Sequence, residues 1–387
     1  MTQDFPRTAD VVIIGGGVMG TSTAYHLARR GVKHVVLVEK EPFFGVMSTG
    51  QCAGGIRHQF SSEINIRLSL ESIRMMERFP EEMGQDIDLR FIGYFFLLTR
   101  EEDVVEFRNN VMLQHSLGVM TEWLEPDDIA RRVPLMSLDG VLAATVYERD
   151  GLVDPSSLVQ GYVSNARRLG ARLFEDAEAV DVQAASGRIK AVETKQGVIE
   201  TPVVVNACGA WAPQIGDMLG VDIPIQPVRR QIVVTTPISE MPPDFPFVIF
   251  FHESLYFHPE GEGILTGKSN PNETPGYKLD VDPEWEMVHM DEAMARLPVL
   301  EKAGLLSHWA GLYEVTPDAH PILGRIPTME GFYLMAGFSG HGLMHGPIVG
   351  SLMAEEILDG RAHTVNIDPF RYDRFLGGEL DPEYNVV

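Results

Sequence analysis

Three glycines near the N-terminus have the spacing that a phosphate-binding turn requires. Gly15, Gly17 and Gly20 follow the apolar run VVII and precede VMGTSTAYHLARR, which has a helical pattern. The first glycine allows a tight turn, the second lets backbone approach a pyrophosphate, and the third lets helix and strand pack closely. Glu39 ends the next apolar run, HVVLVEK, where a carboxylate accepts hydrogen bonds from ribose hydroxyls. The pattern predicts a dinucleotide site, with a purely structural glycine turn as the alternative.

A second glycine-rich stretch, AGFSGHGLMHGP, lies near the C-terminus. We expect a strand before it and a helix that starts between Met344 and Pro347, with Pro347 in the first turn. The free N–H groups of that turn would stabilise the negative charge of a reduced flavin. His341 and His345 have helical i,i+4 spacing and could instead bind a metal. No HExxH glutamate accompanies them, and the neighbouring glycines weaken the helix, so we expect no metal site.

A third stretch, NACGAWA from Asn206, puts small residues after an apolar run, at the end of a predicted strand where ligands collect in open α/β sheets. Nicotinamide and flavin dinucleotides both use such a crevice. Ala24 and Gly31 extend the first glycine pattern in a way that resembles the FAD-binding signature more than the nicotinamide one. FAD also needs later segments of chain to cover its flavin, and the two later stretches can do so.

The segments that must position these residues alternate between strand and helix patterns, which favours an α/β fold. We expect helices near 71–85 and 156–169 and strands within 89–99, and short β-like runs separated by turn residues fill 216–307. The interpretation is a Rossmann-like FAD-binding domain with an inserted, mostly antiparallel β-sheet substrate domain. The predicted boundaries are 1–85, 145–215 and 308–387 for the FAD-binding domain, and 86–144 and 216–307 for the substrate-binding domain.

Composition narrows the classes of function. The chain has 387 residues, 44% of them hydrophobic, and a net charge of -24, so it lacks the basic stripe that nucleic acid would need. No apolar run reaches the roughly 18 residues of a membrane span, and the start MTQDFPRTADVV lacks a secretory apolar region, so we expect a cytoplasmic protein. Cys52 and Cys208 allow at most one disulfide and form no CxxC pair, which excludes a zinc ribbon.

Six segments together resemble the FAD-dependent amine and amino-acid oxidoreductases, the superfamily of D-amino-acid oxidase, glycine oxidase, sarcosine oxidase and bacterial L-proline dehydrogenase. They are GGGVMG, STGQCAGGIRHQFSSEINIRLS, RDGLVDPSSL, NACGAWA, GLYEVTPDAHPILG and GFSGHGLMHGP. The resemblance implies oxidation of a C–N bond, in which a hydride equivalent passes to the flavin and water hydrolyses the resulting imine. It extends the FAD-binding set to Gly15, Gly17, Val18, Met19, Gly20, Glu39, Lys40, Ser48, Thr49, Gly55, Ala207, Gly209, Trp211, Gly311, Gly340, His341, Gly342, Leu343 and Met344.

The same resemblance implies roles at the substrate. Arg57 matches an arginine that clamps the substrate carboxylate, which a bidentate guanidinium does well, although an arginine that holds a loop or the cofactor is the alternative. Lys268 matches a lysine that speeds reaction with oxygen, since an ammonium stabilises superoxide as it forms. Tyr256 matches a tyrosine over the substrate pocket. His58 and His345 are candidates for tuning the ionisation of the substrate amine, with structural roles as the alternative.

Two departures from that resemblance bear on cofactor and substrate. Gly311 stands where the monomeric sarcosine oxidases tether flavin through a cysteine, so we expect non-covalent FAD. Met344 or its neighbour stands where they have a lysine that helps bind carboxylate.

We therefore predict a flavoprotein oxidase of N-methyl or secondary amino acids, with sarcosine, converted to glycine, formaldehyde and hydrogen peroxide, as the first choice. Its partners would be a small amine and oxygen, in a chain that forms homo-oligomers or binds partner subunits. The alternatives are a proline dehydrogenase-type subunit with another electron acceptor and a flavin-bearing assembly protein without turnover.

Overall fold

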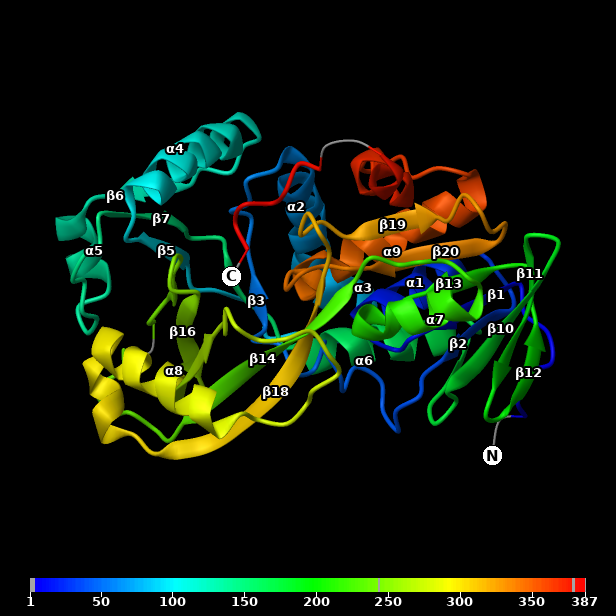
Figure 1. Ribbon diagram of the computed structural model, residues 1–387, viewed down its shortest axis with the longest axis horizontal. Helices are drawn as coiled ribbons and strands as arrows, with labels where there is room; N and C mark the ends of the chain where they lie inside the picture. The colour runs from blue at the N-terminus through cyan, green and yellow to red at the C-terminus, as the bar shows by residue number, and fades with distance from the viewer. Residues whose placement is uncertain (1–3, 243, 378–379, 387) are drawn as a thin grey trace.

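Two large β-sheets form the framework of this computed structural model, which describes residues 4–242, 244–377 and 380–386. The right half of Figure 1 contains a six-stranded sheet in the order β19-β20-β13-β1-β2-β9, and only the β19–β20 pair is antiparallel. Its strands are β1 (Val11–Ile14), β2 (Val35–Val38), β9 (Arg172–Phe174), β13 (Val204–Asn206), β19 (Ile322–Arg325) and β20 (Phe332–Ala336).

Each face of the six-stranded sheet is covered, which is why its strands are continuously apolar. Val11 and Ile13 belong to the core formed with one layer of helices, whereas Val12 and Ile14 belong to the core on the other face. The helices of the first layer are α1 (Val18–Arg29), α2 (Glu63–Glu77), α3 (Phe79–Met83), α6 (Pro155–Arg168) and α9 (Gly342–Asp359). The other face carries β10 (Ala179–Ala185), β11 (Arg188–Thr194), β12 (Gly197–Glu200), the short 3-10 helix η1 (Gly209–Trp211) and α7 (Ala212–Met218).

The left half contains an eight-stranded sheet in the order β18-β14-β17-β16-β15-β5-β7-β6, in which only the β5–β15 pair is parallel (Figure 1). Its strands are β5 (Tyr94–Leu98), β6 (Glu122–Leu124), β7 (Ala143–Tyr147), β14 (Gln226–Thr235), β15 (Phe247–Phe250), β16 (Leu255–Glu260), β17 (Gly263–Lys268) and β18 (Leu305–Val315). The predicted α/β fold with a mostly antiparallel second sheet is confirmed.

The two faces of this second sheet have different neighbours. One face packs against α5 (Pro126–Arg132) and α8 (Pro283–Arg296), and α4 (Glu101–Ser116) contributes to the core on the other. That second face presents Tyr94, Phe247, Ile249 and Tyr256, which also line the cavity described below. Because side chains alternate along a strand, the sequence of β14 to β18 decides which residues reach the cavity.

Smaller elements complete the fold. They are β3 (Gly55–Ile56), β4 (Arg90–Phe91) and β8 (Gly151–Leu152), and the 3-10 helices η2 (Pro298–Lys302), η3 (Asp368–Phe370) and η4 (Tyr372–Leu376). No helix within the described part of the chain is long and apolar enough to cross a membrane.

The division into two domains stays a prediction. β7 and β18 cross its boundaries at 145 and 308, and residues 1–3, 243, 378–379 and 387 of the predicted domains lie outside the described residues.

Candidate active site

A cavity of about 530 Å³ lies between the two sheets, at the carboxyl ends of β1, β2 and β13. The glycine turn between β1 and α1 forms one wall. A Cβ at Gly20 would lie 1.9 Å from the carbonyl oxygen of Gly15, and a Cβ at Gly15 would lie 2.4 Å from the carbonyl oxygen of Ala207. Gly20 does not line the cavity, which corrects its place in the predicted FAD-binding set. It lets α1 pack closely on β1, the other role expected of the third glycine. Gly17 is the N-cap of α1 and has no side chain to cap the helix. The Val18 N–H of the first turn donates to the Thr49 hydroxyl at 3.2 Å, and the helix N-terminus favours an anion beside it.

Glu39 closes this end of the cavity. Its carboxylate accepts hydrogen bonds from the backbone N–H of Gly16 at 2.6 Å and of Glu41 at 2.9 Å. Burial raises the pKa of Glu39, and the two hydrogen bonds oppose that rise. Beside it, the Lys40 ammonium lies 3.8 Å from the centre of the Trp211 ring, a cation–π contact.

The glycine-rich loop near the C-terminus forms the middle of the cavity, but its helix starts earlier than expected. α9 begins at Gly342, so Pro347 lies inside the helix and not in its first turn. Two of its glycines serve helix packing, since a Cβ at Gly346 would lie 2.5 Å from Val18 and one at Gly350 would lie 2.2 Å from the hydroxyl of Ser22. The contact between α9 and α1 therefore explains Gly346 of the glycine-rich stretch and Gly350 beyond it.

His341 and His345 have different surroundings. His341 lines the cavity, is buried, and neither ring nitrogen has a hydrogen-bond partner within the described residues. Burial holds its pKa well below the ordinary value, so the ring is neutral. His345 does not line the cavity: its Nε2 lies 3.0 Å from the hydroxyl of Ser69, beneath the loop. The predicted role of His345 at the substrate is thus wrong in placement, because α9 turns this residue toward α2.

The far end of the cavity lies against the eight-stranded sheet and is rich in aromatic side chains. Tyr256 faces it as predicted, and a Cβ at Gly267 would lie 2.2 Å from the Tyr256 hydroxyl. Three residues that the sequence analysis missed also line this end, and they are Tyr94, Arg230 and Tyr313. The alternation along β14 and β18 could have found two of them, since Arg230 pairs with Gly311 and Tyr313 lies two residues beyond.

Arg57 lines the far end but is largely engaged. Its terminal nitrogens donate hydrogen bonds to the carbonyl oxygens of Gln59 and Asn385, and its guanidinium lies 3.9 Å from the centre of the Phe60 ring. These contacts fit the alternative in which the arginine holds a loop.

His58 is also absent from the cavity wall. Its Nδ1 lies 2.7 Å from the buried carboxylate of Asp150, which corrects its predicted role at the substrate.

Lys268 lies on the opposite face of the sheet. Its ammonium donates to the carbonyl oxygen of Glu253 at 2.6 Å and pairs with Glu292 of α8 at 2.9 Å. Gly267, the preceding residue, faces the side chain of Tyr256, which lines the cavity, so alternation along β17 turns Lys268 away. The predicted placement of Lys268 beside the flavin is wrong for this physical reason.

Comparisons with known proteins identify the family. The family model described as DAO, FAD dependent oxidoreductase, matches residues 10–356. This chain belongs to the DAO family. It is 32% identical to FAD-dependent oxidoreductase domain-containing protein 1 of Xenopus laevis, over 99% of this chain and 85% of that protein. It is also 32% identical to human mitochondrial dimethylglycine dehydrogenase, but over 95% of this chain and 45% of that protein. The crystal structure of L-proline dehydrogenase from P. horikoshii matches with a TM-score of 0.89 and 35% identity, covering 97% of this chain and all of that one.

Membership of the DAO family confirms the predicted resemblance and makes the chain an FAD-dependent amino-acid oxidoreductase. The cavity fits FAD, because it combines a glycine cradle that Cβ atoms would fill with the unpartnered nitrogens of the buried His341. The residues predicted to bind FAD that line it are Gly15, Gly17, Val18, Met19, Glu39, Lys40, Ser48, Thr49, Gly55, Ala207, Gly209, Trp211, Gly311, Gly340, His341, Gly342, Leu343 and Met344.

Proposed function

We propose that this chain is an amino-acid dehydrogenase: it oxidises a C–N bond of N-methyl or cyclic secondary amino acids and passes the electrons to an acceptor other than oxygen. The observation that carries the choice of acceptor is the orientation of Lys268. Among the described residues that line the cavity, the only lysine is Lys40, at the Glu39 end. The described part of the far end therefore has no ammonium to stabilise the negative charge on reduced oxygen. Its cations are the guanidinium groups of Arg57, which donates to two backbone carbonyls, and of Arg230.

Two relatives support the substrate class. One carries the name dimethylglycine dehydrogenase and the other L-proline dehydrogenase, and both names describe amino acids with an alkylated nitrogen. Bound FAD supplies the two-electron acceptor for the hydrogen that leaves the carbon next to the nitrogen. The chain's own residues then have to hold the substrate with that carbon toward the cofactor and exclude water, which the apolar Phe247, Ile249 and Ile232 do at the far end.

FAD is held without a covalent bond in this proposal. Gly311 supplies no thiol, and the two cysteines that line the cavity are poor nucleophiles because burial raises the pKa of Cys52 to about 11 and raises that of Cys208 further. Acid precipitation should therefore release all of the flavin into the supernatant. Flavin that stays in the protein pellet would contradict non-covalent binding.

The test of the function is anaerobic. The holoenzyme is mixed with sarcosine, N,N-dimethylglycine or L-proline, and the absorbance of bound flavin is followed. We expect bleaching by at least one of them, slow return of colour in air, and fast return with an artificial dye acceptor. Hydrogen peroxide formed as fast as substrate is consumed would establish an oxidase instead, and no bleaching by any amine would favour a non-catalytic protein.

A substitution at Lys268 tests whether this residue promotes the reaction of reduced flavin with oxygen. Lys268→Met removes an ammonium on the far face of the sheet, so reoxidation by air should stay within about twofold of the wild-type rate. A large drop in that step alone would restore the oxygen-activating role of Lys268.

A further inference from the structure

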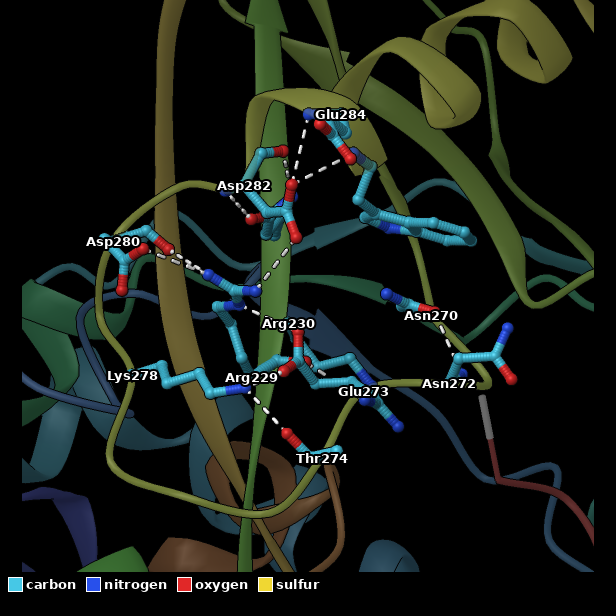
Figure 2. Close-up of polar contacts among 12 residues, drawn as sticks. Arg229, Arg230, Asn270, Asn272, Glu273, Thr274, Lys278, Asp280, Asp282 and Glu284 are labelled. Carbon is cyan, nitrogen blue, oxygen red and sulfur yellow. Dashed lines mark hydrogen bonds and ion pairs between the residues drawn. The ribbon is translucent and has the colours of Figure 1, made fainter.

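Two consecutive arginines on β14 have opposite surroundings. Arg229 lies on the face away from the cavity and is bound by three carboxylates, those of Glu273, Asp280 and Asp282 (Figure 2). Arg230 lines the cavity, and within the described residues no carboxylate pairs with it. Its Nε is buried without a hydrogen-bond partner there, while one terminal nitrogen donates to the carbonyl oxygen of Arg229 at 3.1 Å. Arg230 as a whole is half-buried, and a guanidinium whose Nε is buried with no hydrogen-bond partner is stabilised when an anion binds beside it.

Two phenol groups lie beside this guanidinium. The Arg230 guanidinium carbon is 5.0 Å from the centre of the Tyr313 ring, and Tyr256 is also close enough to interact with its charge. Burial raises the pKa of Tyr256 and Tyr313, so both hydroxyls keep their protons at neutral pH and can donate. Around Arg230, the far end of the cavity therefore combines a cation with the two neighbouring hydroxyl donors of Tyr256 and Tyr313.

The carboxylates that line the cavity lie elsewhere. Glu39 follows β2, Glu178 precedes β10, and Glu314 accepts a hydrogen bond from the backbone N–H of Gly337 at 3.0 Å. Arg57, the other cation at the far end, already donates to two backbone carbonyls. Of the two guanidinium groups at the far end, Arg230 is therefore the one with a buried nitrogen that has no hydrogen-bond partner among the described residues.

We propose that Arg230, together with the hydroxyls of Tyr256 and Tyr313, binds the carboxylate of the substrate, and that Arg57 positions this end of the cavity by holding Gln59 and Asn385. The proposal rests on the proposed function and specifies its substrate class. The substrate is an amino acid with a free carboxylate, and amines without one are rejected because they leave the Arg230 guanidinium without a counter-ion.

The test measures binding, so that it does not depend on turnover. Methoxyacetate, in which an ether oxygen replaces the amine, is titrated into the FAD-loaded protein and followed by the shift in the flavin spectrum. Arg230→Gln should raise its dissociation constant about 10- to 150-fold, since a hydrogen bond to a charged group is lost. Arg230→Lys keeps the charge and should recover part of the affinity. Methoxyacetamide, the neutral analogue, should bind the wild type and Arg230→Gln within about threefold of each other.

Lys268→Met is the matched control, because it removes one positive charge from the neighbouring strand β17 on the opposite face. Methoxyacetate should bind this variant within about twofold of the wild type. Equal weakening in Lys268→Met and Arg230→Gln would overturn the proposal in favour of a long-range charge effect, and unchanged binding in Arg230→Gln would overturn it outright, as would a wild type that binds no methoxyacetate. A wild type that binds methoxyacetate through Arg230 but bleaches with no amino acid would support the clamp and refute the proposed function alone.

Discussion

Replacing Arg229 should release the loop 269–282 from the eight-stranded sheet. The side chains of Arg229 and Glu273 are 7% and 5% exposed, and Arg229→Met leaves the buried Glu273 carboxylate without its main partner (Figure 2). Breaking a buried pair by removing one partner costs about 3–5 kcal/mol. We expect the lower end of that range, because Lys278 still binds Glu273 at 2.8 Å. A loss of about 3 kcal/mol shifts the equilibrium for loop opening on the order of a hundredfold.

Amide hydrogen exchange of loop peptides, measured by mass spectrometry on the FAD-loaded protein, reports that opening. Asp280→Ala is the matched control, since the Asp280 side chain is 79% exposed and its exposed ion pair contributes about 1 kcal/mol or less. Exchange should accelerate at most about fivefold in this control. Exchange in Arg229→Met that equals the wild type, or that equals the Asp280→Ala control, would refute the reasoning. Loss of FAD should accompany opening, because Tyr277 of the loop stacks on Trp211 in the cavity wall at 5.9 Å.

Two further predictions concern pH and packing. Burial raises the pKa of Glu314 to about 7 against the opposing hydrogen bonds from Gly337 and Phe338. In the apoprotein, the stability that Glu314 contributes is therefore present below about pH 4.5 and is lost as the pH rises to about 7. Glu314→Gln should remove this contribution from a profile of Tm against pH, and a profile identical to that of the wild type would contradict it. Gly350→Ala should lower the free energy of unfolding, measured by urea denaturation, by about 1–3 kcal/mol, because the new Cβ would lie 2.2 Å from the Ser22 hydroxyl. Gly304→Ala is the control: its Cβ would meet nothing closer than 3.5 Å, so it should change that free energy by less than about 0.5 kcal/mol. Equal effects of the two substitutions would count against close packing of α9 on α1.

The cofactor end of the site could be predicted from the sequence because its requirements are local. A turn that approaches a pyrophosphate needs Gly15 and Gly17 at fixed spacing after an apolar strand, and Glu39 follows at the end of the next strand. The structure places all three at one cavity.

The substrate end could not be predicted in the same way, because it depends on which face of a long strand each residue occupies. Lys268 and Gly267 differ by one position on β17, and only Gly267 lies on the side of Tyr256 and the cavity. Arg229 and Arg230 are likewise adjacent in the sequence, so no local pattern says which one is bound by carboxylates. The pairing of β14 with β18 decides it, and that pairing is set by contacts far apart in the chain.

The packing of α9 on α1 also has a consequence for biosynthesis. The Ser22 hydroxyl donates to the carbonyl oxygen of Pro347, across 325 positions of sequence. At 5–20 residues per second, a ribosome that has added Ser22 needs roughly 16–65 s to reach Pro347. Throughout that interval the apolar surface of the emerging α1 lacks its neighbour, so the nascent chain should need chaperone protection until α9 has been synthesised, and FAD should be captured only afterwards.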